Sequence, residues 1–180
     1  MYKRQVQDLY SAALDSEQPN QDLKSDFIRT LQKIDPGIQR LDLVQKGRVT
    51  TRLQIKHERT GVTPISALGD GFRRALMIAV TIPTVRGGVL LIDELETALH
   101  VSVLKSVLGL LDWAVREFDV QVFASTHSLE AVDAVLATLP NAKEEMVGYH
   151  LALEGESRRA KRYSGDLWER LRFERGLDIR

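Results

Sequence analysis

The chain has 180 residues, 43% of them hydrophobic, a length typical of one globular domain with a sizeable core. Its 25 basic residues balance 25 acidic ones, so no overall charge attracts it to nucleic acid, an anionic membrane or an acidic substrate. The absence of cysteine excludes disulfide bonds and thiolate metal sites, and no apolar run is long enough to span a bilayer, so we expect a soluble cytoplasmic protein.

The N-terminal third predicts a helix followed by a hairpin. Residues 1–20 are polar with weak helical spacing, which indicates a helical connector. Apolar positions at helical spacing predict a helix over residues 22–34, ended by a Pro-Gly pair. Residues 38–44 and 49–57 alternate apolar and polar side chains, which predicts two hairpin strands closed by a loop at residues 58–64.

The rest of the chain alternates helices and strands. Helical spacing, apolar runs and turn residues predict a helix at 72–82, a strand at 89–92 buried on both faces, a helix at 103–118, a strand at 120–124, a helix at 128–139, strands at 146–153 and 160–163, and a last helix. A strand, a helix and a second strand in this order usually form a parallel crossover. We therefore expect an α/β fold with a mainly parallel sheet and flanking helices.

Two carboxylates, Asp93 and Glu94, follow the apolar strand at 89–92. Ligand sites in open α/β sheets lie at the carboxyl ends of strands. There, Asp93 could hold Mg²⁺ through its water shell, and Glu94 could orient an attacking water or take its proton, as phosphoryl transfer requires. The alternative interpretation is a buried strand that turns polar where it meets solvent.

A histidine, His127, follows the next predicted strand in the sequence Ser125-Thr126-His127-Ser128. An imidazole at this position could reach a terminal phosphate. The alternative is a surface or helix-start histidine, since its serine and threonine neighbours are ordinary cap residues. Because the two strands would be adjacent and parallel, the fold would bring this histidine to the same edge as the two carboxylates.

A glycine-containing turn, Gly69-Asp70-Gly71, opens the helix predicted at 72–82. Free backbone N–H groups and the helix dipole favour an anion at such an N-terminus, and glycine permits close approach. Arg73 or Arg74 could add positive charge to an anion site. A loop-to-helix junction without any ligand is the alternative interpretation.

In chain order, these segments resemble the motifs of the ABC ATPase superfamily. Residues 68–72 are similar to the signature loop, residues 89–94 to Walker B, residues 97–100 to the D-loop, and residues 125–127 to the switch-histidine segment. Over about residues 20–180, the sequence is most similar to stand-alone prokaryotic AAA-type ATPases related to the overcoming-lysogenization-defect and chromosome-maintenance ATPases.

The resemblance implies a role for each motif. Asp93 would help to hold Mg²⁺, Glu94 would activate water, and His127 would sense the γ-phosphate of ATP. The loop of residues 69–71 would cap a nucleotide bound to a partner subunit, so that two subunits close head to tail around two nucleotides. This loop departs from the superfamily pattern, because Gly69 occupies the position that serine usually fills.

The sequence contains no Gly-x-x-x-x-Gly-Lys-Ser/Thr loop to cradle the α- and β-phosphates. We therefore expect residues 1–20 to be a connector and residues 21–180 to be the C-terminal lobe of an ABC-type nucleotide-binding domain. The chain would use ATP and Mg²⁺ only when a Walker A-bearing lobe or subunit completes it, as a homodimer or heteromer. We expect that lobe upstream, removed by truncation or encoded separately, and the natural C-terminus to be present.

Two other functional classes stay open. The chain could be a non-catalytic truncated ATPase module that pairs with a partner ATPase or an effector, such as a nuclease or toxin in phage defence. It could also be a DNA-associated module, because four basic residues gather near its end: Arg158, Arg159, Lys161 and Arg162. Neighbouring glutamates dilute this basic cluster, which favours a solvated turn.

Overall fold

The computed structural model describes residues 21–46, 50–139, 143–154 and 157–178, so the connector predicted at residues 1–20 lies outside the described residues. The α-helices are α2 (Gln21–Ile34), α3 (Asp70–Thr81), α4 (Val101–Phe118), α5 (Leu129–Thr138) and α6 (Gly165–Glu169). Short 3-10 segments lie at Ile65–Ala67 and Ile82–Val85, and a π-helical turn at Arg170–Glu174 follows α6. The strands are β1 (Ile38–Lys46), β2 (Thr50–His57), β3 (Gly61–Pro64), β4 (Val89–Ile92), β5 (Gln121–Ala124), β6 (Val147–Glu154) and β7 (Ser157–Ser164).

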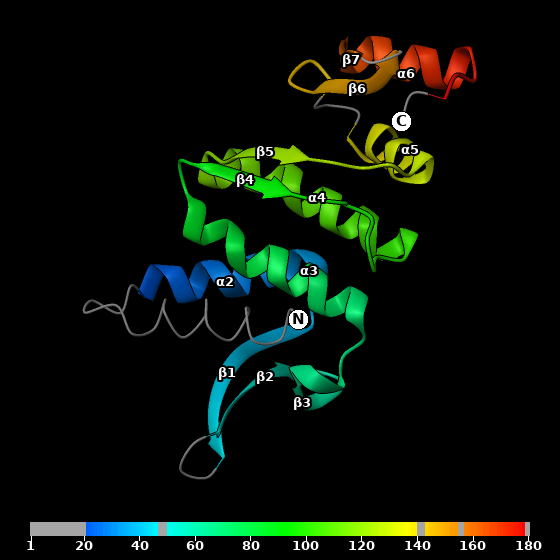
Figure 1. Ribbon diagram of the computed structural model, residues 1–180. Helices are drawn as coiled ribbons and strands as arrows, with labels where there is room; N and C mark the ends of the chain where they lie inside the picture. Colours follow the sequence, from blue (N-terminus) through cyan, green and yellow to red (C-terminus); the bar gives the residue numbers. More distant parts are fainter. Residues whose placement is uncertain (1–20, 47–49, 140–142, 155–156, 179–180) are drawn as a thin grey trace.

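The elements stack in layers (Figure 1). The sheet β1-β2-β3 lies on one side of α2 and α3, and α4 with the pair β4-β5 lies on the other. The predicted α/β class is confirmed. Among the described strands, however, only β4 and β5 pair in parallel, and the other pairings are antiparallel, so the parallel part of the expected sheet is this one pair.

The predicted hairpin is β1 and β2, which pair in antiparallel register with Leu43 opposite Leu53. Apolar residues alternate along both strands, so Leu41, Leu53 and Ile55 point to one buried face. The loop expected at residues 58–64 contains a third strand, β3, which continues the sheet by pairing with β2. Only four residues long, β3 gives too short a pattern to recognise in the sequence.

The parallel pair β4-β5 is joined by α4, as the crossover pattern predicted. Leu90 and Ile92 of β4 point toward the helices and are buried. The prediction that this strand is buried on both faces is wrong for the described residues: Leu91 is 74% exposed and Phe123 of β5 is 52% exposed. The apolar run at residues 89–92 therefore does form a strand, but the described helices cover only one face of the β4-β5 pair.

The main core lies where α2, α3 and α4 meet. Helical spacing turns Leu76 of α3 and Leu110 of α4 into this core, together with Phe27 of α2. Phe118 closes the C-terminal end of α4: it is 1% exposed, and its ring meets Trp113 edge-on at a centroid distance of 5.3 Å. This packing fixes the position at which the chain leaves α4 for β5.

The C-terminal segment is the hairpin β6-β7 followed by α6. Gly148 of β6 packs directly against the indole of Trp168, where an added Cβ would lie 2.4 Å from a ring carbon. Arg172 donates two hydrogen bonds to the carboxylate of Asp133 in α5, at 2.6 and 2.9 Å, and so ties the end of the chain to the rest. In the described ranges, no helix is long and apolar enough to cross a membrane.

The contribution of Phe118 to the core can be measured by replacement. Phe118→Ala should lower the free energy of unfolding by about 3–5 kcal/mol, because it empties a fully buried site between helices. Val115→Ala on the same helix, at a side chain 37% exposed, should cost less than about 1 kcal/mol. Urea unfolding of the two variants compares them, and equal losses would contradict the position assigned to Phe118.

Candidate functional site

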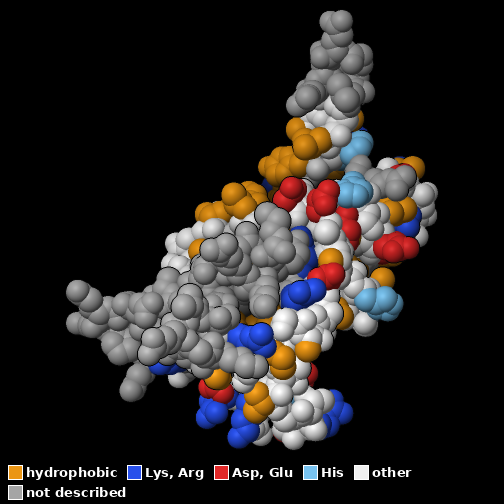
Figure 2. Space-filling model, turned by 60° about the horizontal axis from the view of Figure 1, so that its bottom comes forward, with side chains coloured by type: hydrophobic (Ala, Val, Ile, Leu, Met, Phe, Trp, Pro, Cys, Tyr) orange, Lys and Arg blue, Asp and Glu red, His pale blue; other side chains and the backbone are white. Residues whose placement is uncertain are grey.

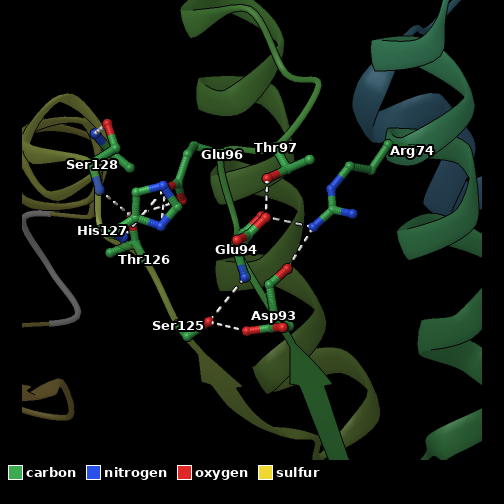
Figure 3. A network of polar contacts seen from close by, with 10 residues as sticks. Arg74, Asp93, Glu94, Glu96, Thr97, Ser125, Thr126, His127 and Ser128 are labelled. Carbon is green, nitrogen blue, oxygen red and sulfur yellow. Dashed lines mark hydrogen bonds and ion pairs between the residues drawn. The ribbon is translucent and has the colours of Figure 1, made fainter.

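The turns after β4 and β5 lie side by side at one edge of the parallel pair (Figure 3). The strand pairing continues past both strands: the N–H of Ser125 donates to the carbonyl of Ile92, and the N–H of Leu95 donates to the carbonyl of Ser125, each at 2.9 Å. The structure therefore brings Asp93 and Glu94 next to the segment that carries His127.

Ser125 links the two turns through its side chain. Its Oγ donates to Oδ1 of Asp93 at 2.5 Å and accepts from the N–H of Glu94 at 2.9 Å. The sequence placed Ser125 in the switch-histidine-like segment and as a cap residue, but gave it no contact with Asp93, because neighbours across the strand pair cannot be read from local spacing. In the structure it orients one carboxylate and fixes the backbone of the next residue.

Glu94 occupies the left-handed region, with φ of 48°, which costs a non-glycine residue on the order of 1–3 kcal/mol. Arg74 of α3 stabilises this turn: Nη2 donates to the carbonyls of Asp93 at 2.7 Å and Glu94 at 2.8 Å. The hydroxyl of Thr97 donates to Oε2 of Glu94 at 2.8 Å and so restrains the carboxylate. The sequence analysis expected Arg74 to add positive charge to an anion site. In the structure it bonds instead to the backbone of the acidic turn, the turn of Asp93 and Glu94 after β4.

His127 projects into solvent, with a side chain 77% exposed, and its imidazole lies within ion-pair distance of Glu96. The hydroxyl of Thr126 donates to Oε2 of Glu96 at 2.7 Å, the N–H of His127 donates to Oε1 at 3.3 Å, and Nδ1 of the imidazole lies 3.6 Å from the same oxygen. Burial raises the pKa of Glu96, but the hydrogen bonds from Thr126 and the backbone, with the nearby imidazole, outweigh burial and lower it below its ordinary value. The sequence analysis did not single out Glu96.

The signature-like loop lies at the N-terminus of α3. Gly69 is the N-cap residue, and Asp70, the first residue of the helix, forms an ion pair with Arg73. Gly71 approaches the turn after β4: a Cβ there would lie 2.7 Å from the carbonyl oxygen of Ala98. The loop therefore packs on the D-loop-like segment, and the charge of Arg73 faces an acid within the loop.

Acidic and histidine side chains lie next to each other on one face of the molecule, with hydrophobic side chains beside them (Figure 2). Carboxylate and hydroxyl oxygens, such as those of Asp93 and Ser125, are the ligands that Mg²⁺ prefers, usually one or two from the protein with water and phosphate completing the shell. Within the described ranges, no group of three or more Asp, Glu or His residues is arranged to hold a metal. The chemistry of Asp93 and Ser125 is compatible with a magnesium ion that takes its other ligands from outside the described residues.

Comparison with solved structures defines the class of fold. A chain from a study of ATP-driven dimerization and DNA-stimulated activation of SMC ATPases superposes with a TM-score of 0.61 at 13% identity, covering 99% of both chains. The Smc head bound to the C-winged helix domain of ScpA gives 0.57 at 19% identity, covering 79% of this chain and 42% of the other. A Pyrococcus furiosus Smc head bound to the C-terminal domain of ScpA gives 0.57 at 16% identity, covering 97% and 41%. The fold is that of the P-loop ATPase heads.

Sequence comparison identifies the family. Residues 1–133 match the family described as AAA domain, putative AbiEii toxin, type IV toxin–antitoxin system, and the chain belongs to this family. Uncharacterized protein MJECL11 of Methanocaldococcus jannaschii is 34% identical over 115 residues, which are 63% of this chain and 99% of that protein. The resemblance to ABC-type and AAA ATPases that the motifs indicated is therefore confirmed at the level of the superfamily.

The contact between the signature-like loop and the turn after β4 can be tested with two glycines. Gly71→Ala should destabilise the chain by about 1–3 kcal/mol, because the new methyl group meets the backbone of Ala98, which must shift. Gly69→Ala should cost less than about 1 kcal/mol, since φ is −62° and no atom lies within 4 Å of the added Cβ. Thermal or urea unfolding distinguishes them, and a Gly71 variant as stable as the Gly69 variant would contradict the contact.

Proposed function

We propose that the chain is the Walker B and signature half of an ABC-type ATPase, which binds and hydrolyses ATP with Mg²⁺ once a Walker A-bearing lobe or subunit completes the site. The observation that carries this proposal is the meeting of Asp93, Glu94 and the His127 turn at one edge of β4-β5. Under this proposal residues 21–180 form the C-terminal lobe of the nucleotide-binding domain.

Asp93 is the residue proposed to hold the metal, and Ser125 orients it. Their hydrogen bond keeps Oδ1 on the β5 side of the turn. When bound, Mg²⁺ supplies electrostatic stabilisation of the phosphate oxygens. An aspartate whose orientation is fixed before the nucleotide arrives loses less side-chain freedom on binding, which favours a defined geometry.

Glu94 is the proposed base that orients the attacking water and takes its proton. Two features support this role: Glu94 is exposed at the edge of β4-β5, and the hydroxyl of Thr97 donates a hydrogen bond to its Oε2. The left-handed backbone of Glu94 is stabilised by Arg74, which donates to the carbonyls of Asp93 and Glu94. A strained backbone supported by several hydrogen bonds is common at catalytic positions.

His127 is proposed to contact the terminal phosphate, and the loop of Gly69, Asp70 and Gly71 to cap a nucleotide held by a second subunit. The exposed imidazole and the exposed start of α3 are both accessible to a partner. A helix N-terminus favours an anion through its free N–H groups. Arg73 would contribute its charge there only by giving up its ion pair with Asp70.

The surface that the missing lobe would cover is the uncovered face of β4-β5. Val89, Leu91 and Phe123 are exposed on it, although strands of parallel sheets usually carry helices on both faces. The chain spans 42% and 41% of two of the Smc head chains that it matches, which leaves room in those two proteins for a second lobe, whereas it spans 99% of the chain from the study of SMC ATPases. We infer that a Walker A-bearing lobe packs on this face and that two completed units close around nucleotide.

The family description names a putative toxin and so favours a second candidate function. In this function the chain is a module that binds a partner ATPase or an effector without hydrolysing ATP. The same apolar face would serve that purpose. A DNA-associated role has less support from the geometry, because alternation along β7 sends Arg159 and Lys161 to one face of the strand and Arg162 to the other.

Hydrolysis by the completed protein separates these functions. The chain alone should bind Mg-ATP weakly or not at all, and a Walker A-bearing lobe should restore turnover. Glu94→Gln in the completed protein should lower kcat by about 10²–10⁴-fold while nucleotide stays bound, because it removes the base but keeps the shape of the side chain. Glu58→Gln, at an exposed carboxylate after β2, is the matched control and should leave turnover unchanged.

Two results would count against the proposal. Calorimetry that finds micromolar Mg-ATP binding by the chain alone would show that no second lobe is needed. Turnover that persists in Glu94→Gln would remove Glu94 from the role of base and favour the non-catalytic module.

A further inference from the structure

We propose that Glu96 is a positioning residue for His127: its carboxylate fixes the backbone of the His127 turn and lies at ion-pair distance, 3.6 Å, from Nδ1 of the imidazole, which leaves Nε2 for the ligand. This inference rests on the proposed function for its role in catalysis, whereas the contact itself does not depend on nucleotide. Glu96 and His127 are 31 residues apart in sequence, so the contact exists only because β4 and β5 are adjacent.

The first step of the argument is the backbone anchor. Thr126 donates its hydroxyl to Glu96 and accepts from the N–H of Ser128 at 3.1 Å, so one hydroxyl joins the carboxylate to the N-cap residue of α5. The N–H of His127, between these two residues, also points at Glu96. Thr126 and His127 thus bond to the carboxylate directly, and Ser128 is linked to it through the hydroxyl of Thr126.

The second step is the imidazole itself. With 77% of its side chain exposed, His127 has little packing to fix its ring, whereas Glu96 is only 17% exposed. A carboxylate next to one ring nitrogen favours the tautomer that carries its proton on that nitrogen. Because Oε1 lies 3.6 Å from Nδ1, Glu96 favours the Nδ1–H form and directs the lone pair of Nε2 outward.

The third step is the rigidity of the segment that carries Glu96. Leu95, the residue between Glu94 and Glu96, is 2% exposed in the core, and its N–H bonds the carbonyl of Ser125. Glu96 is also ionised at neutral pH, since its pKa is lowered. The turn after β4 therefore places Glu94 at the edge of β4-β5 and Glu96 against the His127 turn. The same backbone segment thus positions both the proposed base and the proposed phosphate sensor.

The tautomer of His127 can be observed directly in the 180-residue chain. Long-range ¹H–¹⁵N spectra of the histidine-labelled chain, recorded at about pH 8.5, report which ring nitrogen carries the proton. We expect His127 to be mainly Nδ1–H. His100 provides an internal comparison, because the N–H of Ser102 donates to its Nδ1 at 3.4 Å and the hydroxyl of Ser102 lies 3.0 Å from the same nitrogen, an arrangement that favours the proton on Nε2.

Glu96→Gln is the test variant, because the amide keeps the size of the side chain and an oxygen acceptor for Thr126 while it removes the charge. The ratio of Nδ1–H to Nε2–H in His127 should fall by at least about threefold. Glu130→Gln, which removes an exposed charge from the first turn of α5, should leave the ratio unchanged. An unchanged ratio in Glu96→Gln overturns the proposal.

The wild-type spectrum keeps the inference testable if the variant does not fold: a His127 that is mainly Nε2–H overturns it without any substitution. In the completed ATPase, Glu96→Gln should lower kcat by about tenfold with little change in KM, because only the orientation of the sensor changes. If Glu96→Gln shifts the tautomer of His127 but the completed protein does not hydrolyse ATP, the Glu96–His127 contact is supported and the proposed function is contradicted. The two proposals can therefore be refuted independently.

Discussion

The site depends on one interaction, the parallel pairing of β4 with β5 and its continuation into the turns that follow. Ile92 lies opposite Ala124, and the next backbone bonds join Ser125 to Ile92 and Leu95 to Ser125. Without this register, the acidic turn and the histidine turn would have no common edge. The Oγ of Ser125 then completes the link between the backbone and the carboxylate of the acidic turn.

The helices determine where that edge lies. α4 connects the two strands and buries Leu110 and Phe118 against α2 and α3, which fixes the spacing of the pair. α3 contributes twice: Arg74 holds the carbonyls of the acidic turn, while the signature-like loop at the start of the same helix packs on Ala98. A movement of α3 would therefore reach the loop and the acidic turn together, which would couple the proposed subunit interface to the proposed base through a rigid element.

Much of the fold could be predicted because its signals are local. Apolar spacing predicted α4 to within two residues at its start, and the apolar run at residues 89–92 predicted β4. The features that sequence reasoning missed depend on neighbours distant in the chain. The exposure of Leu91 depends on which helices cover the sheet, and the contacts of Ser125 and Glu96 depend on strand register. The roles of Asp93, Glu94 and His127 stay predictions, which the geometry supports.

The most direct measurement of the shared edge is a double-mutant cycle between the two turns. Asp93→Ala, Ser125→Ala and the double variant are unfolded in urea, and the coupling free energy is taken from the three losses. The structure predicts a coupling of at least about 0.5 kcal/mol, because the hydroxyl of Ser125 donates to the carboxylate of Asp93. Losses that simply add would contradict the account, since they would mean that the hydroxyl of Ser125 and the carboxylate of Asp93 do not link the two turns.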